Sequence, residues 1–186
     1  TYAKEITSVL GSHGVSDVIN LAPKKVQGVL NGCDYTQWDP ATDILIPARF
    51  SINDMRGKAQ CKAELQKQSA LPVIKSVPLI GMVCRATRQK GFDFILPIIE
   101  DLLQHKVQIS IMGTGDELIT AKLRDVSQRF PDKFSFVEAF KPEFSHLIEA
   151  GADFFLMPSE FEPCGLNQMY SLAYGTLPIV RKVGGL

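Results

Sequence analysis

The sequence has neither a long apolar run nor an excess of charge of one sign. Its 186 residues include 20 basic and 20 acidic side chains. No stretch approaches the roughly 18–20 consecutive apolar residues that span a bilayer. Residues 1–10 also lack the apolar block of a secretory signal. We therefore expect no membrane association and no nucleic acid as the main partner.

Cysteine and histidine are sparse, which argues against a metal centre. Neither a CxxC pair nor a Cys/His group at zinc-binding spacing occurs among Cys33, Cys61, Cys84, Cys164 and the three histidines. Reduced thiols in a cytosolic protein are the simplest interpretation. The acid pair DxD, which often holds a metal-bound nucleotide sugar, is absent as well. Side chains and helix ends would then have to neutralise any bound diphosphate.

From residue 78 onward, short apolar runs alternate with amphipathic segments. Strands are expected at 78–83, 107–112, 134–140, 153–158 and 176–183, and helices at 91–106, 116–130, 143–152 and 165–175. This alternation predicts an α/β fold with a Rossmann-like parallel sheet and helices on both faces. Pro97 predicts a kink or a late start in the first helix. Pro178 predicts that the last strand starts late or lies near an edge.

Residues 1–77 do not follow this alternation. Within 28–43 we expect a short strand, followed by turns at Asn31-Gly32 and Asp39-Pro40. Residues 52–70 carry several Lys and Glu and are typical of a polar helix. The segment 70–78 would connect this helix to the alternating region.

Polar, charged or glycine residues follow all five expected strands. Ligands of open parallel sheets bind beyond the carboxyl ends of the strands, and the topology brings these five ends to one rim. Arg85, Arg88 and Lys90 precede an expected helix start. Because a helix N-terminus already carries partial positive charge, added cations there favour an anion such as a diphosphate. The alternative is a solvated basic turn that pairs with Asp93.

The loops that follow the second and third strands give weaker indications. Gly113 and Gly115 would let a ligand approach the backbone closely, but a tight turn with Asp116 capping the next helix explains the same residues. Phe140 ends a strand, and its ring could stack on a nucleobase. The alternative for Phe140 is a place in the core.

The stretch SEFEPCGLNQ (159–168) places acids, a cysteine and a glycine before an expected helix. Glu162 would stay charged near the helix start and accept hydrogen bonds from sugar hydroxyls, and Gly165 would open the backbone to the same ligand. Alternatively, Glu160 and Glu162 only complement the helix dipole. A nucleophilic Cys164 would need a histidine base, and no partner motif is recognisable.

Several sequence blocks occur together in a family-like order. They are TYAKEI (1–6), GVLNGCDYTQWDPATD (28–43), CRATRQKGFD (84–93) and the long block 151–186. On these blocks the chain resembles the C-terminal half of bacterial glycogen synthase and plant starch synthase, the ADP-glucose-dependent retaining glucosyltransferases. The resemblance implies a GT-B architecture. Residues 1–24 would end the N-terminal, acceptor-side domain, and residues 25–186 would form the nucleotide-sugar-binding domain, truncated at its C-terminus.

The resemblance also implies an activity and its partners. Glucose would pass from ADP-glucose to the non-reducing end of an α-1,4-glucan with retention, without a metal or other cofactor. The missing N-terminal domain would be needed, so the fragment alone is expected to be inactive. The location would be cytoplasmic in a bacterium or the plastid in a plant. Alternatives are a non-catalytic nucleotide-binding module and a UDP-glucose-dependent GT-B enzyme; the latter usually carries a second Glu where this chain has Tyr170.

The resemblance assigns roles to matching positions. Arg85 and Lys90 would bind the diphosphate and stabilise its charge, and Glu162 would hydrogen-bond the donor glucose. These three are the expected catalytic residues. The positions expected to bind the substrate are Gly113, Gly115, Phe140, Cys164, Gly165, Leu166, Asn167, Gly184 and Gly185. Phe140 matches the aromatic that stacks on adenine, and Asn167 stands where this branch often has Thr.

Overall fold

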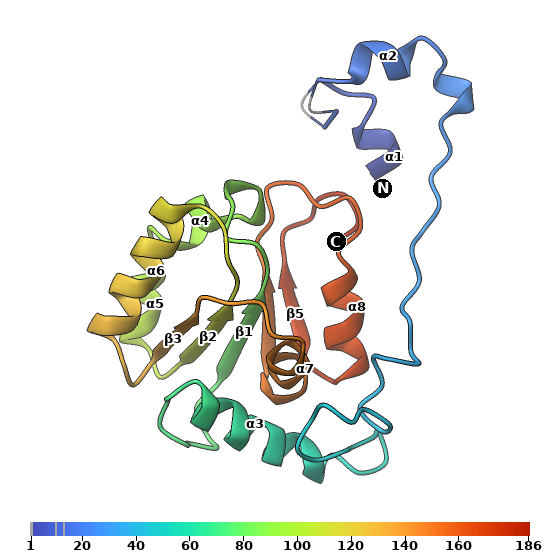
Figure 1. The fold of residues 1–186 in the computed structure, drawn as a ribbon. Coiled ribbons are helices and arrows are strands. Elements are labelled where there is room, and N and C mark those ends of the chain that lie inside the picture. Colours follow the sequence, from blue (N-terminus) through green and yellow to red (C-terminus); the bar gives the residue numbers. More distant parts are fainter. Residues whose placement is uncertain (1, 10, 13) are drawn as a thin grey trace.

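The computed structural model describes residues 2–9, 11–12 and 14–186. Its centre is a parallel sheet in the order β3-β2-β1-β4-β5 (Figure 1). The strands are β1 (Leu79–Val83), β2 (Gln108–Met112), β3 (Phe134–Val137), β4 (Phe154–Met157) and β5 (Leu177–Val180). The predicted Rossmann-like α/β sheet is therefore confirmed. β1 and β4 are neighbours in the sheet but far apart in sequence, so the order reverses between them.

Helices cover both faces of the sheet (Figure 1). They are α3 (Arg56–Gln68), α4 (Phe92–Ile95), α5 (Ile99–Gln104), α6 (Glu117–Arg129), α7 (Pro142–Gly151) and α8 (Leu166–Ala173), preceded by the short α1 (Tyr2–Glu5) and α2 (Ser16–Asn20). Two short 3₁₀ turns, η1 (Pro23–Lys25) and η2 (Arg88–Lys90), complete the described elements. The helix expected at 91–106 is divided into α4 and α5 around Pro97, which has no N–H for a continuous helix.

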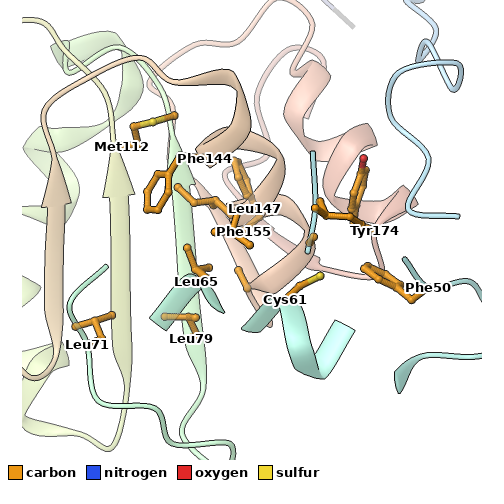
Figure 2. Packing of buried hydrophobic residues seen from close by; sticks show 14 of the residues in the cluster. Phe50, Cys61, Leu65, Leu71, Leu79, Met112, Phe144, Leu147, Phe155 and Tyr174 are labelled. Carbon is orange, nitrogen blue, oxygen red and sulfur yellow. The ribbon is translucent and has the colours of Figure 1, made fainter. Parts of the chain in front are cut away.

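The core consists of two apolar clusters, one on each side of the sheet. Leu65 of α3, Leu147 of α7 and Phe155 of β4 belong to the first, which Figure 2 shows from close by. Phe92 and Leu103 belong to the second, under α4–α6. Burial of one such side chain contributes about 1.5–3 kcal/mol. The two clusters hold the strand ends, and hence the loops beyond them, in fixed positions.

The helix expected at 52–70 forms as α3. One face of it is buried in the core, although its composition indicated a polar helix. Cys61 and Leu65 are fully buried against α7. Lys62 extends its amine to Asp153 at 2.6 Å and to the carbonyl oxygens of Lys75 and Val77. The aliphatic part of Lys62 can therefore lie in the interface while its charge is fully paired.

Three strand predictions need correction, one of which is the strand expected at 176–183, since β5 ends at Val180. The strand expected within 28–43 does not form; residues 26–33 are extended and largely exposed, and no ladder includes them. Their backbone groups are left to solvent because no strand edge lies beside them. The strand expected at 134–140 ends at Val137, where the N–H of Ala139 bonds back to the Val137 carbonyl at 2.9 Å. β5 pairs with β4 alone in the described part of the chain, as Pro178 predicted for an edge.

An aromatic cluster attaches the loop of residues 34–50 to the helices. Trp38 lies between the rings of His146 and Tyr170, with centroid distances of 3.9 and 4.0 Å. The buried Asp43 accepts a hydrogen bond from the hydroxyl of Tyr174 at 2.5 Å and contacts Nδ1 of His146 at 2.8 Å. This loop is therefore part of the folded unit, although it contains no helix or strand.

Candidate functional site

A cavity of about 300 Å³ opens beyond the carboxyl ends of β1, β2 and β4. It lies at the point where the strand order reverses, which is where open parallel sheets bind ligands. Its lining includes eight of the twelve residues predicted for the site, namely Arg85, Lys90, Gly113, Phe140, Glu162, Gly165, Leu166 and Asn167. The expected convergence of separate loops on one rim therefore occurs for these residues.

Lys90 and Glu162 form an ion pair at the centre of the cavity wall. Nζ of Lys90 lies 2.5 Å from Oε2 of Glu162, and the two side chains are 20% and 9% exposed. The hydroxyl of Ser159 donates to the same oxygen at 3.1 Å. The pair is thus partly desolvated, which strengthens its electrostatic interaction. A ligand that carries both negative charge and hydroxyl groups could contact Lys90 through its charge and Glu162 through its hydroxyls, in place of their contact with each other.

The neighbouring backbone fixes Lys90 opposite Glu162. Gly91 has a φ of +82°, and a Cβ at this position would lie 2.1 Å from the carbonyl oxygen of Pro158. The side-chain amide of Gln89 donates to the carbonyl of Phe161 at 2.9 Å, and the N–H of Glu160 donates to the carbonyl of Gln89 at 2.8 Å. These contacts tie the β1 loop to the loop before α8. Sequence reasoning missed Gln89 and Ser159 because no motif marks such bracing contacts.

The three cations of the β1 loop have different environments. Arg88 pairs with Asp93 at 2.9 Å, and its side chain is 78% exposed. For Arg88 the solvated-turn alternative therefore holds. Arg85 is exposed on the cavity rim, and no ion pair involving it is found in the described part of the chain. Arg85 and Lys90 are thus the cations that face the cavity.

The Gly-Thr-Gly loop owes its glycines to contact between two loops. A Cβ on Gly113 would lie 1.8 Å from the carbonyl oxygen of Cys84, and one on Gly115 would lie 2.3 Å from that of Ala86. Asp116 caps α6 by accepting from the N–H groups of Leu118 and Ile119 at 2.8 and 3.2 Å, as the alternative interpretation predicted. Gly113 lines the cavity but Gly115 does not.

Phe140 stands at the cavity rim with 74% of its surface exposed. The alternative that placed it in the core is therefore wrong. An exposed aromatic face beside a polar cavity is suited to stacking against a flat ring.

The start of α8 forms the opposite wall. Gly165 precedes the helix with a φ of +77°, and no side chain caps the first turn. Glu162 is bonded to Lys90 and Ser159 and does not cap this helix, while Glu160 is exposed. The backbone N–H groups of the first turn can therefore bind a ligand. Asn167 is tied to the end of β1, because its amide donates to the carbonyl of Val83 at 3.1 Å.

The remaining predicted residues lie outside this cavity. Cys164 and Gly185 line a second cavity, of about 490 Å³, together with residues of the N-terminal segment such as Tyr2 and Ile6. Gly184 and Gly185 pack against the loop before α8; Cβ atoms on them would lie 2.0 Å from the Glu162 carbonyl oxygen and 2.2 Å from that of Cys164. This close packing leaves no room for a side chain at either position and therefore requires glycine.

Among the described residues, no thiol is paired with a histidine in the manner of a reactive centre. Burial raises the pKa of the Cys84 thiol, which lines the cavity, to about 12. His146 is committed to Asp43 and Trp38. Within the described residues, no three His, Cys, Asp or Glu side chains are arranged to hold a metal ion. In the same part of the chain, no helix has the length and apolar character needed to cross a membrane.

These features define a class of protein. Residues 64–186 match the model of the glycosyl transferases group 1 family, and the chain belongs to this family. Within it, the chain is similar to glycogen synthases: it is 51% identical over 185 residues to that of Aeromonas hydrophila and 53% identical over 188 residues to that of Photobacterium profundum. The predicted resemblance is confirmed. Both alignments cover 100% of this chain but only 38% and 37% of the relatives.

A solved structure shows the same relationship. It is the catalytic domain of starch synthase IV from Arabidopsis thaliana bound to ADP and acarbose, which superposes with a TM-score of 0.93 at 37% sequence identity. The match covers 100% of this chain and 38% of that one. The described sheet and its helices therefore correspond to part of a catalytic domain of the GT-B type.

Proposed function

We propose that this chain is the donor-binding part of a glycogen or starch synthase. The enzyme would transfer glucose from ADP-glucose to the non-reducing end of an α-1,4-glucan with retention of configuration. The observation that carries the proposal is the cavity at the point where the strand order of the sheet reverses. Both the Lys90–Glu162 pair and the uncapped start of α8 line this cavity. The similarity to glycogen synthases and to an ADP-bound starch synthase domain supports it.

The diphosphate would be bound by Arg85, Lys90 and the first turn of α8. On donor binding, Lys90 would exchange its contact with Glu162 for a phosphate oxygen, and Glu162 would accept hydrogen bonds from glucose hydroxyls. Both charges then keep a partner, so neither is left desolvated and unpaired. Phe140 would stack on the adenine. Charge that develops on the leaving diphosphate would be stabilised by the same cations, a contribution often worth ~10²–10³ in rate per group.

We propose a division of the chain at about residue 25. Residues 1–24 would end the acceptor-side domain, and residues 25–186 would belong to the nucleotide-sugar-binding domain. The glucan acceptor and the rest of the N-terminal domain would then be the partners of this chain. The limited coverage of the relatives supports the expectation that the chain alone does not elongate glucan.

Calorimetry with ADP, ADP-glucose and UDP-glucose tests the donor assignment. We expect the two adenosine ligands to bind and the uridine donor to bind more weakly, since the exposed ring of Phe140 favours the larger base. Tighter binding of UDP-glucose than of ADP-glucose would overturn the assignment. Absence of binding by all three ligands would overturn the proposed function.

A further inference from the structure

The N-terminal segment makes a direct contact with the C-terminal turn. Oε1 of Glu5, the last residue of α1, accepts a hydrogen bond from the N–H of Gly184 at 2.8 Å. In Figure 1, α1 lies beside the C-terminal end of the chain, although the two are at opposite ends of the sequence. A hydrogen bond to a carboxylate is stronger than one between neutral groups.

Glu5 is held in place by its own turn. Its carbonyl oxygen accepts from the hydroxyl of Ser8 at 2.7 Å, and a Cβ on Gly11 would lie only 2.3 Å from the same oxygen. The N–H of Ser8 also donates to this carbonyl at 2.9 Å. The carboxylate therefore extends from a compact turn, which limits the positions that it can adopt.

The turn that Glu5 contacts is packed on the loop that carries Glu162. The N–H of Gly185 donates to the Glu162 carbonyl at 2.8 Å, and the Gly185 carbonyl accepts from the side chain of Gln168 at 2.6 Å. Gly184 has a φ of +52° and leaves no room for a Cβ beside the Glu162 carbonyl. A shift of the turn would therefore shift the main chain of Glu162.

We propose that Glu5 is a positioning residue for the donor cavity. It holds the turn of residues 183–186 against the loop before α8. Through its contacts with that loop, the turn keeps Glu162 opposite Lys90. Among the described residues, neither Glu5 nor Gly184 lines this cavity beyond β1, β2 and β4, so Glu5 acts behind the cavity wall and does not occupy the place of the ligand. The effect on ligand binding rests on the proposed function; the effect on the turn does not.

The first test measures the turn without any ligand. Amide hydrogen exchange of Gly184 would be followed by NMR in the 186-residue chain and in the variants Glu5→Ala, Glu5→Gln and Lys4→Ala. We expect at least about tenfold faster exchange in Glu5→Ala, because the acceptor is lost, and a smaller change in Glu5→Gln, which keeps a carbonyl acceptor. Lys4 is an exposed neighbour on α1 and should have no effect. Unchanged exchange in Glu5→Ala would overturn the proposal.

The second test measures ADP affinity of the same variants by calorimetry. We expect Glu5→Ala to weaken ADP binding about five- to tenfold, Glu5→Gln to restore most of the affinity, and Lys4→Ala to match the parent. Tighter binding by Glu5→Ala would mean that the carboxylate opposes the ligand, and equal binding would mean that the turn does not act on the cavity; either result overturns the proposal. If the parent itself does not bind ADP, the proposed function fails, and the exchange experiment still decides whether Glu5 holds the turn.

Discussion

Lys90 and Glu162 neutralise each other in a cavity that we expect to bind an anion. Their contact at 2.5 Å is largely shielded from water and holds the two side chains opposite each other. Removing one partner of such a pair leaves the other charge without compensation. The two residues should therefore be more sensitive to substitution than Arg85, for which the described part of the chain offers no ion-pair partner.

The cations of the β1 loop offer a matched set of variants. We expect Arg85→Ala to weaken ADP binding about tenfold or more, as the loss of a charged hydrogen bond does. Lys90→Ala should cost more, because Glu162 would then face the diphosphate without its counter-charge. Arg88→Ala removes a cation from the same loop that pairs with Asp93 in solvent, and should change affinity less than twofold. Calorimetry would measure all three. A loss in Arg88→Ala equal to the other two would mean that only the net charge of the loop matters.

Glu149 of α7 is a buried carboxyl with an unsatisfied oxygen. It is 1% exposed, and its Oε2 has no hydrogen-bond partner among the residues that the structure describes. Burial raises its pKa well above the ordinary value of 4.5, while burial lowers the pKa of the nearby Lys58 to about 8. Between pH 4.5 and the raised pKa, the carboxyl of Glu149 is protonated in the folded state and ionised in the unfolded state, so the folded state binds more protons. Stability should therefore fall as the pH rises from 4.5 toward the folded pKa of Glu149.

Glu149→Gln should remove this pH dependence. The amide cannot ionise, so the stability of the variant relative to the parent should increase from pH 4.5 to pH 8, whatever constant offset the substitution adds. Urea denaturation followed by circular dichroism at several pH values would measure the difference. Glu143→Gln, an exposed position on the same helix, is the control and should show no such trend. A constant difference across the pH range would contradict the assignment.

At the scale of elements, a buried carboxylate links the loop of residues 34–50 to two helices, and Ile46 and Phe50 of the same loop add apolar packing. Asp43 accepts from Tyr174 and contacts His146, and His146 stacks on Trp38. Without Asp43, these buried polar groups would lose their acceptor. The attachment of the loop to α7 and α8 would then be weakened before the sheet itself is affected.

We expect Asp43→Ala to destabilise the chain by about 1–3 kcal/mol. Trp38 is the single tryptophan of the sequence, so its fluorescence reports on this loop alone, and its emission should shift toward the red in the variant. Asp34→Ala changes an exposed turn in the same loop and should leave the emission in place. Unchanged emission in Asp43→Ala would show that ring stacking and the apolar packing of Ile46 and Phe50 hold the loop without Asp43.

The elements were largely predictable because their signals are local. Apolar periodicity located all five strands of the sheet, and Pro97 and Pro178 correctly predicted the helix interruption and the edge strand. The failure at residues 28–43 has a physical reason: a strand needs a neighbouring edge, and sequence does not show whether one lies nearby. The aromatic cluster around Trp38 was missed because its members come from three distant segments.

At the scale of the whole molecule, the place of the cavity was predictable from the sequence but the contacts within it were not. The rule that ligands bind beyond parallel strand ends located the rim. It could not show that Lys90 pairs with Glu162, or that Gly113, Gly115 and Gly184 serve loop packing. Side-chain partners and close backbone approaches depend on the assembled loops, and several such loops contribute to this cavity.

The proposed function also predicts a separation of binding from catalysis. The chain should bind ADP and ADP-glucose, yet a mixture with ADP-glucose and a maltooligosaccharide should give no longer glucan, since the acceptor-side domain is needed for transfer. Chromatography of the oligosaccharide products would measure this, with a full-length glycogen synthase as the positive control. Elongation by the chain alone would contradict the expectation.

The free edge of β5 has a consequence for handling the chain in solution. Leu177, Ile179 and Val180 are each between about 39% and 58% exposed, and their strand pairs on one side only in the described structure. Such an edge can recruit the edge of another molecule and begin aggregation. Pro178 lacks an N–H and interrupts the row of donors that a second strand would need. We expect this proline to limit such edge pairing, and Pro178→Val should aggregate at a lower protein concentration in light-scattering measurements.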